Sequence, residues 1–144
     1  MKNRICFVCL GNICRSPMAE YMLKEKLRRK NLLNNYYVTS KATSYEEEGN
    51  DIYPPAKDKL REKKIPFDRH YAKRVEKDDL EKFDYFICME DNNISNLQRI
   101  IGDSDKIIKL LERDISDPWY TGEFEKTYQD IDEGLDLLID KLFK

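Results

Sequence analysis

Short apolar runs alternate along this chain with longer segments whose apolar residues recur at helical spacing. Runs rich in β-branched and aromatic residues are typical of strands, and they predict strands at residues 4–8, 36–39, 85–89 and 106–109. Apolar residues three and four positions apart predict helices within residues 16–33, 54–63, 77–82, from 91 onward, and 124–142. This alternation implies a parallel sheet with right-handed crossovers.

The clearest amphipathic pattern lies in the last predicted helix. Its apolar stripe consists of Ile131, Leu135, Leu138, Ile139 and Leu142. Such a stripe usually packs into the core of its own domain, so we expect core packing here rather than a partner surface. No repeat, linker or low-complexity segment interrupts the 144 residues, and we expect residues 1–144 to form a single domain.

Charge and composition narrow the class of protein. The 26 basic and 28 acidic residues nearly balance, and no long basic block marks a nucleic-acid surface. The first apolar run is too short for a signal peptide or a membrane span. We therefore expect a cytoplasmic protein with no nucleic-acid or membrane partner, and we take it to be a monomer.

Four cysteines lie at positions 6, 9, 14 and 88. Without an export signal, free thiols are expected rather than a disulfide framework. Cys6 and Cys9 have a spacing found in zinc sites, but positions i and i+3 of a strand point to opposite faces. We therefore expect no metal and no other cofactor. Cys6 and Cys88 lie inside predicted strands and are expected to be inert core thiols.

Residues 9–17, Cys-Leu-Gly-Asn-Ile-Cys-Arg-Ser-Pro, leave the first predicted strand and enter the first predicted helix. Such a loop points backbone N–H groups and the positive end of the helix dipole at one anion site. Cys9 adds a thiol to that site, and Arg15 adds a fork of five N–H donors. These groups favour a thiolate and would also hold the oxygens of a phosphoryl group. The pattern predicts attack of a thiolate on phosphorus.

Three further residues of the loop suit this chemistry. Gly11 permits a close approach of the backbone to a ligand, and Asn12 tolerates a positive φ. The hydroxyl of Ser16 can donate a hydrogen bond to the sulfur and so ease its departure in a second step. The alternative is an ordinary strand-to-helix turn with a buried Cys and a solvated Arg.

Cleavage of a phosphate ester also needs an acid for the leaving oxygen. Among many carboxylates, Asp117 precedes Pro118, which holds it extended in a turn that can aim it into a site. Asp-Pro by itself is more often an ordinary turn. Because ligands bind beyond the carboxyl ends of parallel strands, we expect loops 9–16, 40–49 and 112–121 to meet, with Asp117 close to Cys9.

Residues 9–17, followed by Met-Ala-Glu at 18–20, resemble the phosphate loop of the low-molecular-weight protein tyrosine phosphatases. Asp-Pro-Trp-Tyr at 117–120 resembles the general-acid loop of that family. The similarity runs from residue 4 to residue 143 and includes Ser40 and His70. With this resemblance, the expected fold is a three-layer α/β/α arrangement whose four-stranded parallel sheet has the flavodoxin-like order 2-1-3-4.

The resemblance implies phosphotyrosine hydrolysis through a cysteinyl-phosphate, with Cys9 as nucleophile, Asp117 as acid and then base, and Arg15 on the equatorial oxygens. In the family, Asn12 holds the loop through hydrogen bonds to residues matching Ser40 and His70. Phosphotyrosine-bearing proteins or peptides are the implied partners, and phosphate or other oxyanions the implied inhibitors. The implied phosphate-binding residues are Leu10, Gly11, Asn12, Ile13, Cys14 and Ser16.

The resemblance leaves some roles open. Cys14 is either a small loop residue or, as in relatives with a second Cys at this spacing, a reversible disulfide partner of the nucleophile. The substrate pocket is expected to involve Ile13, Trp119 and Tyr120, with Tyr45 replacing the family's aromatic wall. The three glutamates at 46–48 either form a solvated loop or disfavour acidic peptides and attract basic ones.

Competing functions share parts of this pattern. Arsenate reductases of this fold need two further downstream cysteines, whereas only Cys88 is present. Protein-arginine phosphatases carry Thr where this loop has Ile13, and an apolar side chain suits an aryl ester better. A Cys phosphocarrier without hydrolytic turnover would not need Asp117. A catalytically idle phosphotyrosine-binding module would need neither Cys9 nor Asp117.

Overall fold

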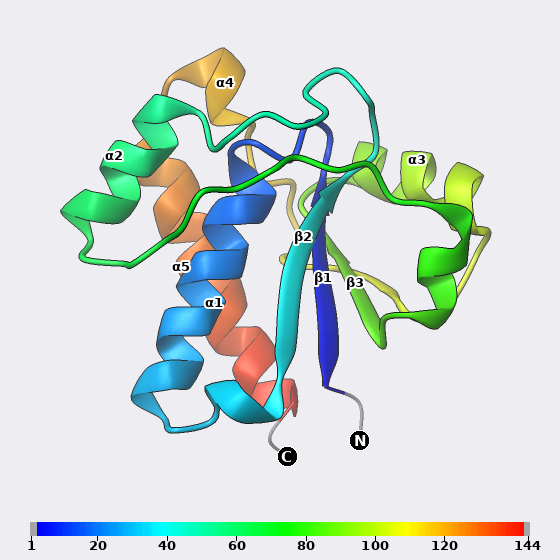
Figure 1. The fold of residues 1–144 in the computed structure, drawn as a ribbon, viewed down its shortest axis with the longest axis horizontal. Helices are drawn as coiled ribbons and strands as arrows, with labels where there is room; N and C mark the ends of the chain where they lie inside the picture. Colours follow the sequence, from blue (N-terminus) through cyan, green and yellow to red (C-terminus); the bar gives the residue numbers. More distant parts are fainter. Residues whose placement is uncertain (1–2, 143–144) are drawn as a thin grey trace.

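The computed structural model describes residues 3–142. Within them, four parallel strands form a sheet in the order β2-β1-β3-β4, which confirms the expected order (Figure 1). The bounds of the strands are β1 Arg4–Cys9, β2 Tyr37–Ala42, β3 Tyr85–Cys88 and β4 Ile107–Lys109.

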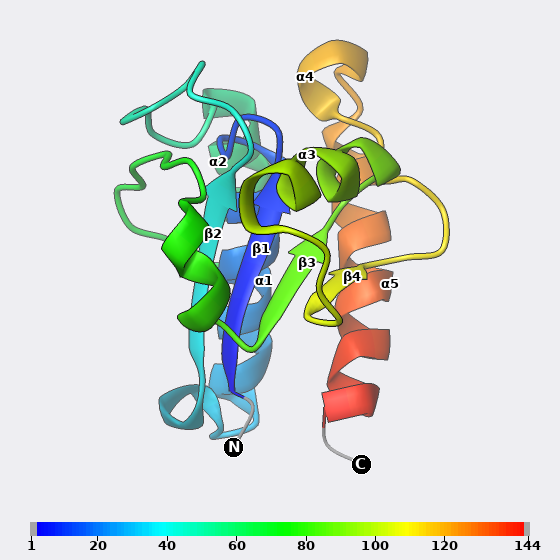
Figure 2. The same cartoon turned by 90° about the vertical axis from the view of Figure 1, so that its right-hand side faces the viewer.

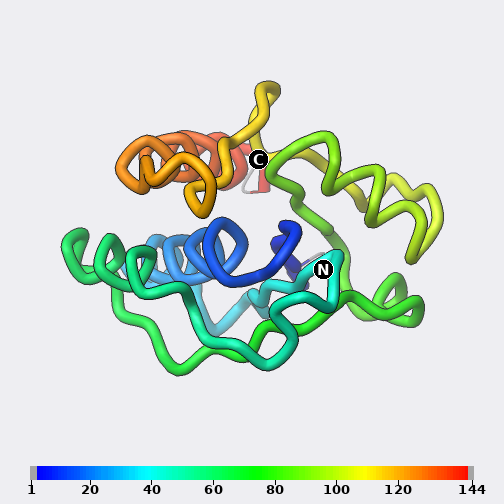
Figure 3. The backbone as a smooth tube through the Cα atoms, turned by 90° about the horizontal axis from the view of Figure 1, so that it is seen from above, coloured from blue at the N-terminus to red at the C-terminus, as the bar shows by residue number. Residues whose placement is uncertain are grey.

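Helices cover both faces of the sheet, as the three-layer prediction requires. Figures 1 and 2 show α1, α2 and α5 on one side of the strands and α3 with the short helix η2 on the other. Seen from above the carboxyl edge in Figure 3, the sheet separates these two groups. The helices are α1 Arg15–Arg29, η1 Leu33–Asn35, α2 Pro54–Glu62, η2 Lys77–Glu81, α3 Asp91–Ile101, α4 Pro118–Thr121 and α5 Phe124–Leu142.

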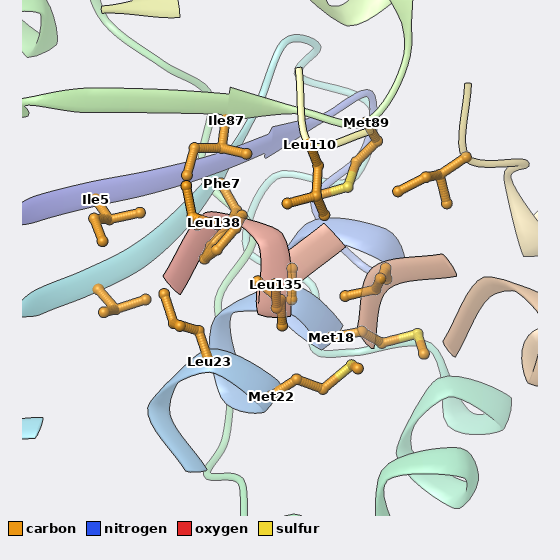
Figure 4. Close-up of a cluster of buried hydrophobic side chains, with 14 of the residues drawn as sticks. Ile5, Phe7, Met18, Met22, Leu23, Ile87, Met89, Leu110, Leu135 and Leu138 are labelled. Carbon is orange, nitrogen blue, oxygen red and sulfur yellow. The ribbon is translucent and has the colours of Figure 1, made fainter. Parts of the chain in front are cut away.

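The central strand β1 is apolar on both faces because each face is covered. Ile5 and Phe7 pack in the core beneath α1 and α5, while Cys6 and Val8 pack against Phe86, Leu97 and the rest of the α3 layer. Figure 4 shows the first of these cores, where side chains from β1, β3, α1 and α5 meet. The alternation also places Cys6 and Cys9 in different cores, as expected for positions i and i+3 of a strand.

The last helix packs into the core, as its sequence pattern predicts. Ile131 and Leu135 are completely buried, and Leu138 and Ile139 are nearly so. Gly134 allows the helix to approach the segment after β4, because a Cβ at this position would lie 2.5 Å from Leu110 Cγ. The helix therefore sets the position of the chain that leaves β4 and leads to Asp117.

The structure corrects several predicted boundaries. Strand β2 continues past Ser40 to Ala42, so Ser40 lies within the strand rather than at its end. The predicted helix at 77–82 is a 3-10 helix, and the single-turn helix α4 was not predicted. Cys6 and Cys88 are completely buried, as expected for core thiols. None of the helices between residues 3 and 142 is long and apolar enough to cross a membrane.

Candidate active site

The loop between β1 and α1 lies at the carboxyl end of the central strand. Strand β1 ends at Cys9 and helix α1 begins at Arg15. Asn12 has φ 61°, the left-handed conformation that an Asn tolerates better than most side chains. This turn makes it possible for the chain to reverse from strand to helix within a few residues, so that the loop encloses the space above Cys9.

The Cys9 sulfur lies against the first turn of α1. Ser16 Oγ is 3.0 Å from Cys9 Sγ, and the backbone N–H of Ser16 donates to the same sulfur at 3.4 Å. Asn12 Nδ2 donates to Ser16 Oγ at 2.7 Å, so the hydroxyl hydrogen of Ser16 is free to point at the sulfur. Both donors and the end of the helix dipole stabilise a thiolate more than a thiol.

Asn12 is held by the segment that follows α2. His70 Nε2 lies 2.7 Å from the Asn12 carbonyl oxygen, and the Lys73 N–H donates to Asn12 Oδ1 at 3.2 Å. Because a carbonyl oxygen only accepts, His70 donates from Nε2 and carries its proton there. Burial lowers the pKa of His70, although the hydrogen bond to Asn12 opposes this effect. His70 therefore lies where the family resemblance expects a loop support.

Ser40 does not have the expected contact with Asn12. Its hydroxyl instead donates to Glu20 Oε1 at 2.6 Å, and Lys24 Nζ donates to the other oxygen of that carboxylate. The sheet register explains the difference, because Ser40 pairs with Phe7, two residues before Cys9. At that level Ser40 faces the side of α1 rather than the loop above it. The predicted Ser40–Asn12 hydrogen bond is therefore wrong.

Arg15 is 1% exposed and bonded at both ends of its guanidinium group. Nη1 donates to Glu90 Oε2 at 2.9 Å and to the Ile115 carbonyl oxygen at 2.8 Å, and Nη2 lies 3.4 Å from Asp117 Oδ2. Burial alone would lower the pKa of Arg15, but the nearby Cys9, Asp117 and Glu90 raise it overall. The guanidinium therefore stays charged beside the sulfur, and its position is fixed.

Glu90 is a residue that the sequence analysis missed. It lies just beyond the end of β3 and is the N-cap of α3, and its side-chain oxygen reaches the buried Arg15. Its place in the chain could have identified it, because the loop after the third strand must also lie at the carboxyl edge of the sheet.

Asp117 caps α4 and faces Arg15. Its backbone is extended, with φ −81° and ψ 112°, as expected for a residue before proline. Oδ1 accepts the Trp119 N–H at 3.1 Å, and Oδ2 is the oxygen nearest Arg15. The preceding residue is tied to α5, where Thr127 Oγ1 donates to the Ser116 carbonyl oxygen at 3.2 Å. The carboxylate thus lies where the distance prediction placed it, next to the loop of Cys9.

These residues line one open cavity. Residues 9–15 of the phosphate loop form its floor, and segments 46–47 and 117–120 form its walls. The three loops expected to meet at the sheet edge therefore do so. The wall residues are Glu46, Glu47, Asp117, Trp119 and Tyr120.

Within the described chain, Tyr45 is not part of the cavity wall. It is 60% exposed, its ring lies 4.6 Å from the guanidinium of Arg74, and its hydroxyl accepts from Arg74 Nη1 at 3.2 Å. Glu46 and Glu47 take the place expected for an aromatic side chain, and Glu47 Cγ lies 3.3 Å from the site of a Cβ at Gly11. The predicted role of Tyr45 as pocket wall is wrong. The close approach seen at Gly11 is to the Glu47 side chain, and an approach of its backbone to a ligand stays a prediction.

Cys14 is buried within the loop that follows Cys9. It packs with Ile13 and Ala72 and also lines the cavity. Burial raises the pKa of its thiol well above the ordinary value, and the proximity of Cys9 adds to the shift. Cys14 is therefore held as a thiol while the site is reduced.

Comparisons with known proteins agree with this arrangement. Residues 4–144 match the family described as low molecular weight phosphotyrosine protein phosphatase. The low molecular weight protein-tyrosine-phosphatase PtpA of Staphylococcus haemolyticus is 38% identical over 97% of this chain and 94% of its own length. YfkJ of Bacillus subtilis, with the same description, is 36% identical over 97% of this chain and 96% of its own length.

Solved structures give the same result. The crystal structure of SP-PTP from Streptococcus pyogenes has a TM-score of 0.92 at 36% identity, covering 99% of this chain and 94% of that one. Wzb of Vibrio vulnificus, solved in complex with benzylphosphonate, has a TM-score of 0.87 at 26% identity, covering 98% and 99%. The chain therefore belongs to the low-molecular-weight protein tyrosine phosphatases, a family of phosphoric monoester hydrolases.

Proposed function

We propose that this protein hydrolyses phosphotyrosine and small aryl phosphates through a cysteinyl-phosphate intermediate. The observation that carries the proposal is the convergence of Cys9, Arg15 and Asp117 on one cavity, the first two from the loop after β1 and the third from a distant segment. A thiolate, a fixed cation and a carboxyl group are the three groups that phosphoryl transfer to a sulfur requires.

In the first step the Cys9 thiolate attacks phosphorus and forms an S–P bond, while the bond from phosphorus to the tyrosyl oxygen breaks. The Asp117 carboxyl gives its proton to that oxygen, so tyrosine leaves as a neutral phenol. Arg15 and the N–H groups of the phosphate loop hold the equatorial oxygens, whose negative charge they match in the transition state. Asp117, now a carboxylate, is stabilised by the guanidinium at 3.4 Å.

In the second step water attacks the cysteinyl-phosphate. The Asp117 carboxylate takes a proton from that water, the S–P bond breaks, and inorganic phosphate is released. Sulfur departs as a thiolate, which the Ser16 hydroxyl at 3.0 Å and the Ser16 N–H at 3.4 Å stabilise. The carboxyl and the thiolate are thereby restored for the next turnover.

The shape of the cavity supports an aromatic ester as substrate. Trp119 and Tyr120 form one wall and Ile13 lies in the floor, so these three side chains give a phenyl ring apolar surface to pack against. The phosphate group reaches the loop at the bottom, where free phosphate and other oxyanions compete as inhibitors. Benzylphosphonate, which Wzb of Vibrio vulnificus binds, has the same combination of an aromatic ring and a phosphorus oxyanion.

We also propose that phosphotyrosine-bearing proteins or peptides are the partners, and that residues 1–144 act as a single cytoplasmic, monomeric domain. The family implies phosphoprotein substrates, and the match over residues 4–144 supports a single unit.

For Cys14 we propose a protective role under oxidation. Peroxide converts the Cys9 thiolate to a sulfenic acid, and the Cys14 sulfur displaces water to form a disulfide. Both residues line the same cavity. The raised pKa of Cys14 keeps it from competing as a nucleophile toward phosphate while the enzyme is reduced.

The other functions receive no support from the comparisons. The relatives named above are described as tyrosine phosphatases, and none of these descriptions is that of a protein-arginine phosphatase or a Cys phosphocarrier. A phosphocarrier also has no use for the acid that Asp117 supplies.

The test is turnover of p-nitrophenyl phosphate, a phosphotyrosine peptide and a phosphoarginine peptide by wild type, Cys9→Ser and Asp117→Asn. Cys9→Ser is expected to have no turnover, and Asp117→Asn to lose about 10²- to 10³-fold on phosphotyrosine. Asp136→Asn, which changes an exposed carboxylate on α5, is the control and should match wild type. Full activity of Cys9→Ser would refute the mechanism, and faster turnover of phosphoarginine would change the substrate.

A further inference from the structure

Tyr53 contacts both the phosphate loop and the segment that carries Asp117, residues 117–121, which we call the acid segment. It does not line the cavity between them. Its backbone N–H donates to the Ile13 carbonyl oxygen at 2.9 Å. Its ring lies against the ring of Trp119, with the centroids 4.5 Å apart and the planes tilted by 52°. Trp119 follows Asp117 by two positions, so one residue bridges the two halves of the site.

The backbone of Tyr53 is held at the start of α2. Tyr53 precedes Pro54 and is the N-cap of α2, with φ −57° and ψ 132°. Its carbonyl oxygen accepts the Ala56 N–H at 2.9 Å as the helix begins. Helix α2 is in turn tied to α5 by an ion pair of 3.0 Å between Lys59 Nζ and Glu125 Oε1. The ring of Tyr53 is therefore presented from a well-anchored helix start.

The acid segment depends on the contact between Tyr53 and Trp119 more than the phosphate loop does. Trp119 is 47% exposed and Tyr120 is 75% exposed, in a helix of a single turn that ends at Gly122 with φ 73°. The Trp119 N–H donates to Asp117 Oδ1 at 3.1 Å. A shift of Trp119 therefore moves or releases the carboxyl group that must reach the leaving oxygen.

We infer that Tyr53 is a positioning residue for the general acid. The ring of Tyr53 holds Trp119 in place, and Trp119 in turn holds the Asp117 carboxyl. The backbone N–H of Tyr53 holds the phosphate loop, so the carboxyl and the loop keep a fixed relative position. A one-ångström displacement of a proton donor is enough to slow transfer, whereas the thiolate and Arg15 stay in place. This inference rests on the proposed function, because it assigns Asp117 the role of acid.

The test uses the leaving group, because a merely structural role does not depend on it. Tyrosine, with a phenol pKa of about 10, needs a proton as it leaves. p-Nitrophenolate is a far more stable anion and needs little help. We expect Tyr53→Ala to lower kcat/KM about tenfold for a phosphotyrosine peptide and no more than about twofold for p-nitrophenyl phosphate. Tyr53→Phe, which keeps the ring, should restore both values.

A second measurement reports the contact itself. Trp119 is the one tryptophan of the chain, so its fluorescence is a direct probe of the ring that Tyr53 covers. Tyr53→Ala should increase acrylamide quenching of Trp119, and Tyr53→Phe should not. Tyr37→Ala is the matched control, since Tyr37 is also part of a ring pair, 6.1 Å from Phe83, at the amino end of β2.

Combining variants separates positioning from a general loss of structure. If Tyr53 acts through Asp117, adding Tyr53→Ala to Asp117→Asn should cost no further activity on phosphotyrosine. Equal losses on both substrates, additive losses in the double variant, or unchanged quenching would overturn the inference while leaving the proposed function intact. Absence of turnover by wild type on either substrate would instead refute the proposed function and the inference with it.

Discussion

The phosphate loop and the acid segment meet over one cavity but are held in opposite ways. In the loop, Asn12 and Ser16 are completely buried and Arg15 is 1% exposed. His70 and Ile115 bond Asn12 and Arg15 from other parts of the fold, and Asn12 in turn bonds Ser16. In the acid segment, Trp119 and Tyr120 are largely exposed on a single helical turn. The first is part of the core of the molecule, and the second lies on its surface (Figure 2).

This difference fits the role that the proposed mechanism gives each segment. The phosphate oxygens gain most from donors that need no rearrangement as charge develops, which favours a buried and fully bonded loop. The acid must admit the aromatic ring and release the product, which favours a segment with few buried contacts. Changes in the phosphate loop should therefore affect all substrates alike. Changes at the rim of the cavity, residues 46–47 and 117–120, should affect some substrates more than others.

The largest effect in this comparison is expected at Glu90. Removing its charge leaves Arg15 without its closest anionic partner, 2.9 Å away, in a site where the guanidinium is buried. Glu90→Gln should lower kcat/KM about tenfold, and Glu90→Ala about a hundredfold, to the same extent for p-nitrophenyl phosphate and for phosphotyrosine peptides. Steady-state kinetics with both substrates checks this.

The control for Glu90 is Glu112→Gln, an exposed carboxylate on the segment between β4 and α4. It should match wild type on every substrate. If Glu90→Gln slowed peptides but not p-nitrophenyl phosphate, the phosphate loop would not be the uniform unit that its contacts indicate.

The sequence predicted the buried parts of the fold best. The parallel sheet follows from the alternation of apolar runs with helical patterns, and its order was expected from the family resemblance. Helix α5 has the predicted bounds, and its apolar stripe repeats at helical spacing from Ile131 to Leu142. Asn12 was expected to tolerate a positive φ and has φ 61°. In these regions local propensity, apolar spacing and the final packing all favour the same structure.

Prediction failed where a side-chain contact depends on how distant segments meet rather than on a local pattern. Tyr45 turns outward onto Arg74 because the loop after β2 follows no periodic pattern that would fix which residue faces the cavity. Ser40 bonds Glu20 rather than Asn12 because it pairs with Phe7, two residues before the loop begins at Cys9. Glu90 was missed because nothing in its local sequence distinguishes it from other surface carboxylates; only the fold brings it to Arg15.

The rim offers the next test of the comparison, with a smaller effect. Glu46 and Glu47 form a cavity wall, and Glu47 Oε2 accepts from the neutral side chain of Asn50 at 2.6 Å. Wild type should prefer phosphotyrosine peptides with Lys next to the phosphotyrosine over those with Glu, by about three- to tenfold in kcat/KM at low salt. The double variant Glu46→Lys, Glu47→Lys should reverse this ranking.

Salt and a matched variant make the rim test specific. The preference should shrink as ionic strength rises, because exposed charges are screened. Glu48→Gln, on the same loop but with its carboxylate on the Arg74 N–H, should keep the wild-type ranking. An equal rate for all peptides in wild type would show that the three glutamates are only a solvated loop.

The smallest effect concerns the support beneath the loop and appears in stability rather than catalysis. Burial lowers the pKa of His70 below its ordinary 6.5, so the folded protein keeps this ring neutral where the unfolded chain protonates it. As the pH falls below about 6.5, the unfolded state binds more protons, and the free energy of unfolding decreases by at most about 1.4 kcal/mol per pH unit. The decrease ends below the pKa of the folded state.

Urea unfolding between pH 7.5 and pH 5.5 measures this effect in a range where His70 is the one histidine to titrate. Carboxylates with a strongly lowered pKa, such as Glu25 and Glu125 at about 2, contribute only at lower pH. His70→Gln keeps an N–H that can reach the Asn12 carbonyl oxygen but cannot titrate, so its stability should change less across this range. An equal pH dependence in wild type and His70→Gln would mean that the loop is held as firmly by a charged ring as by a neutral one.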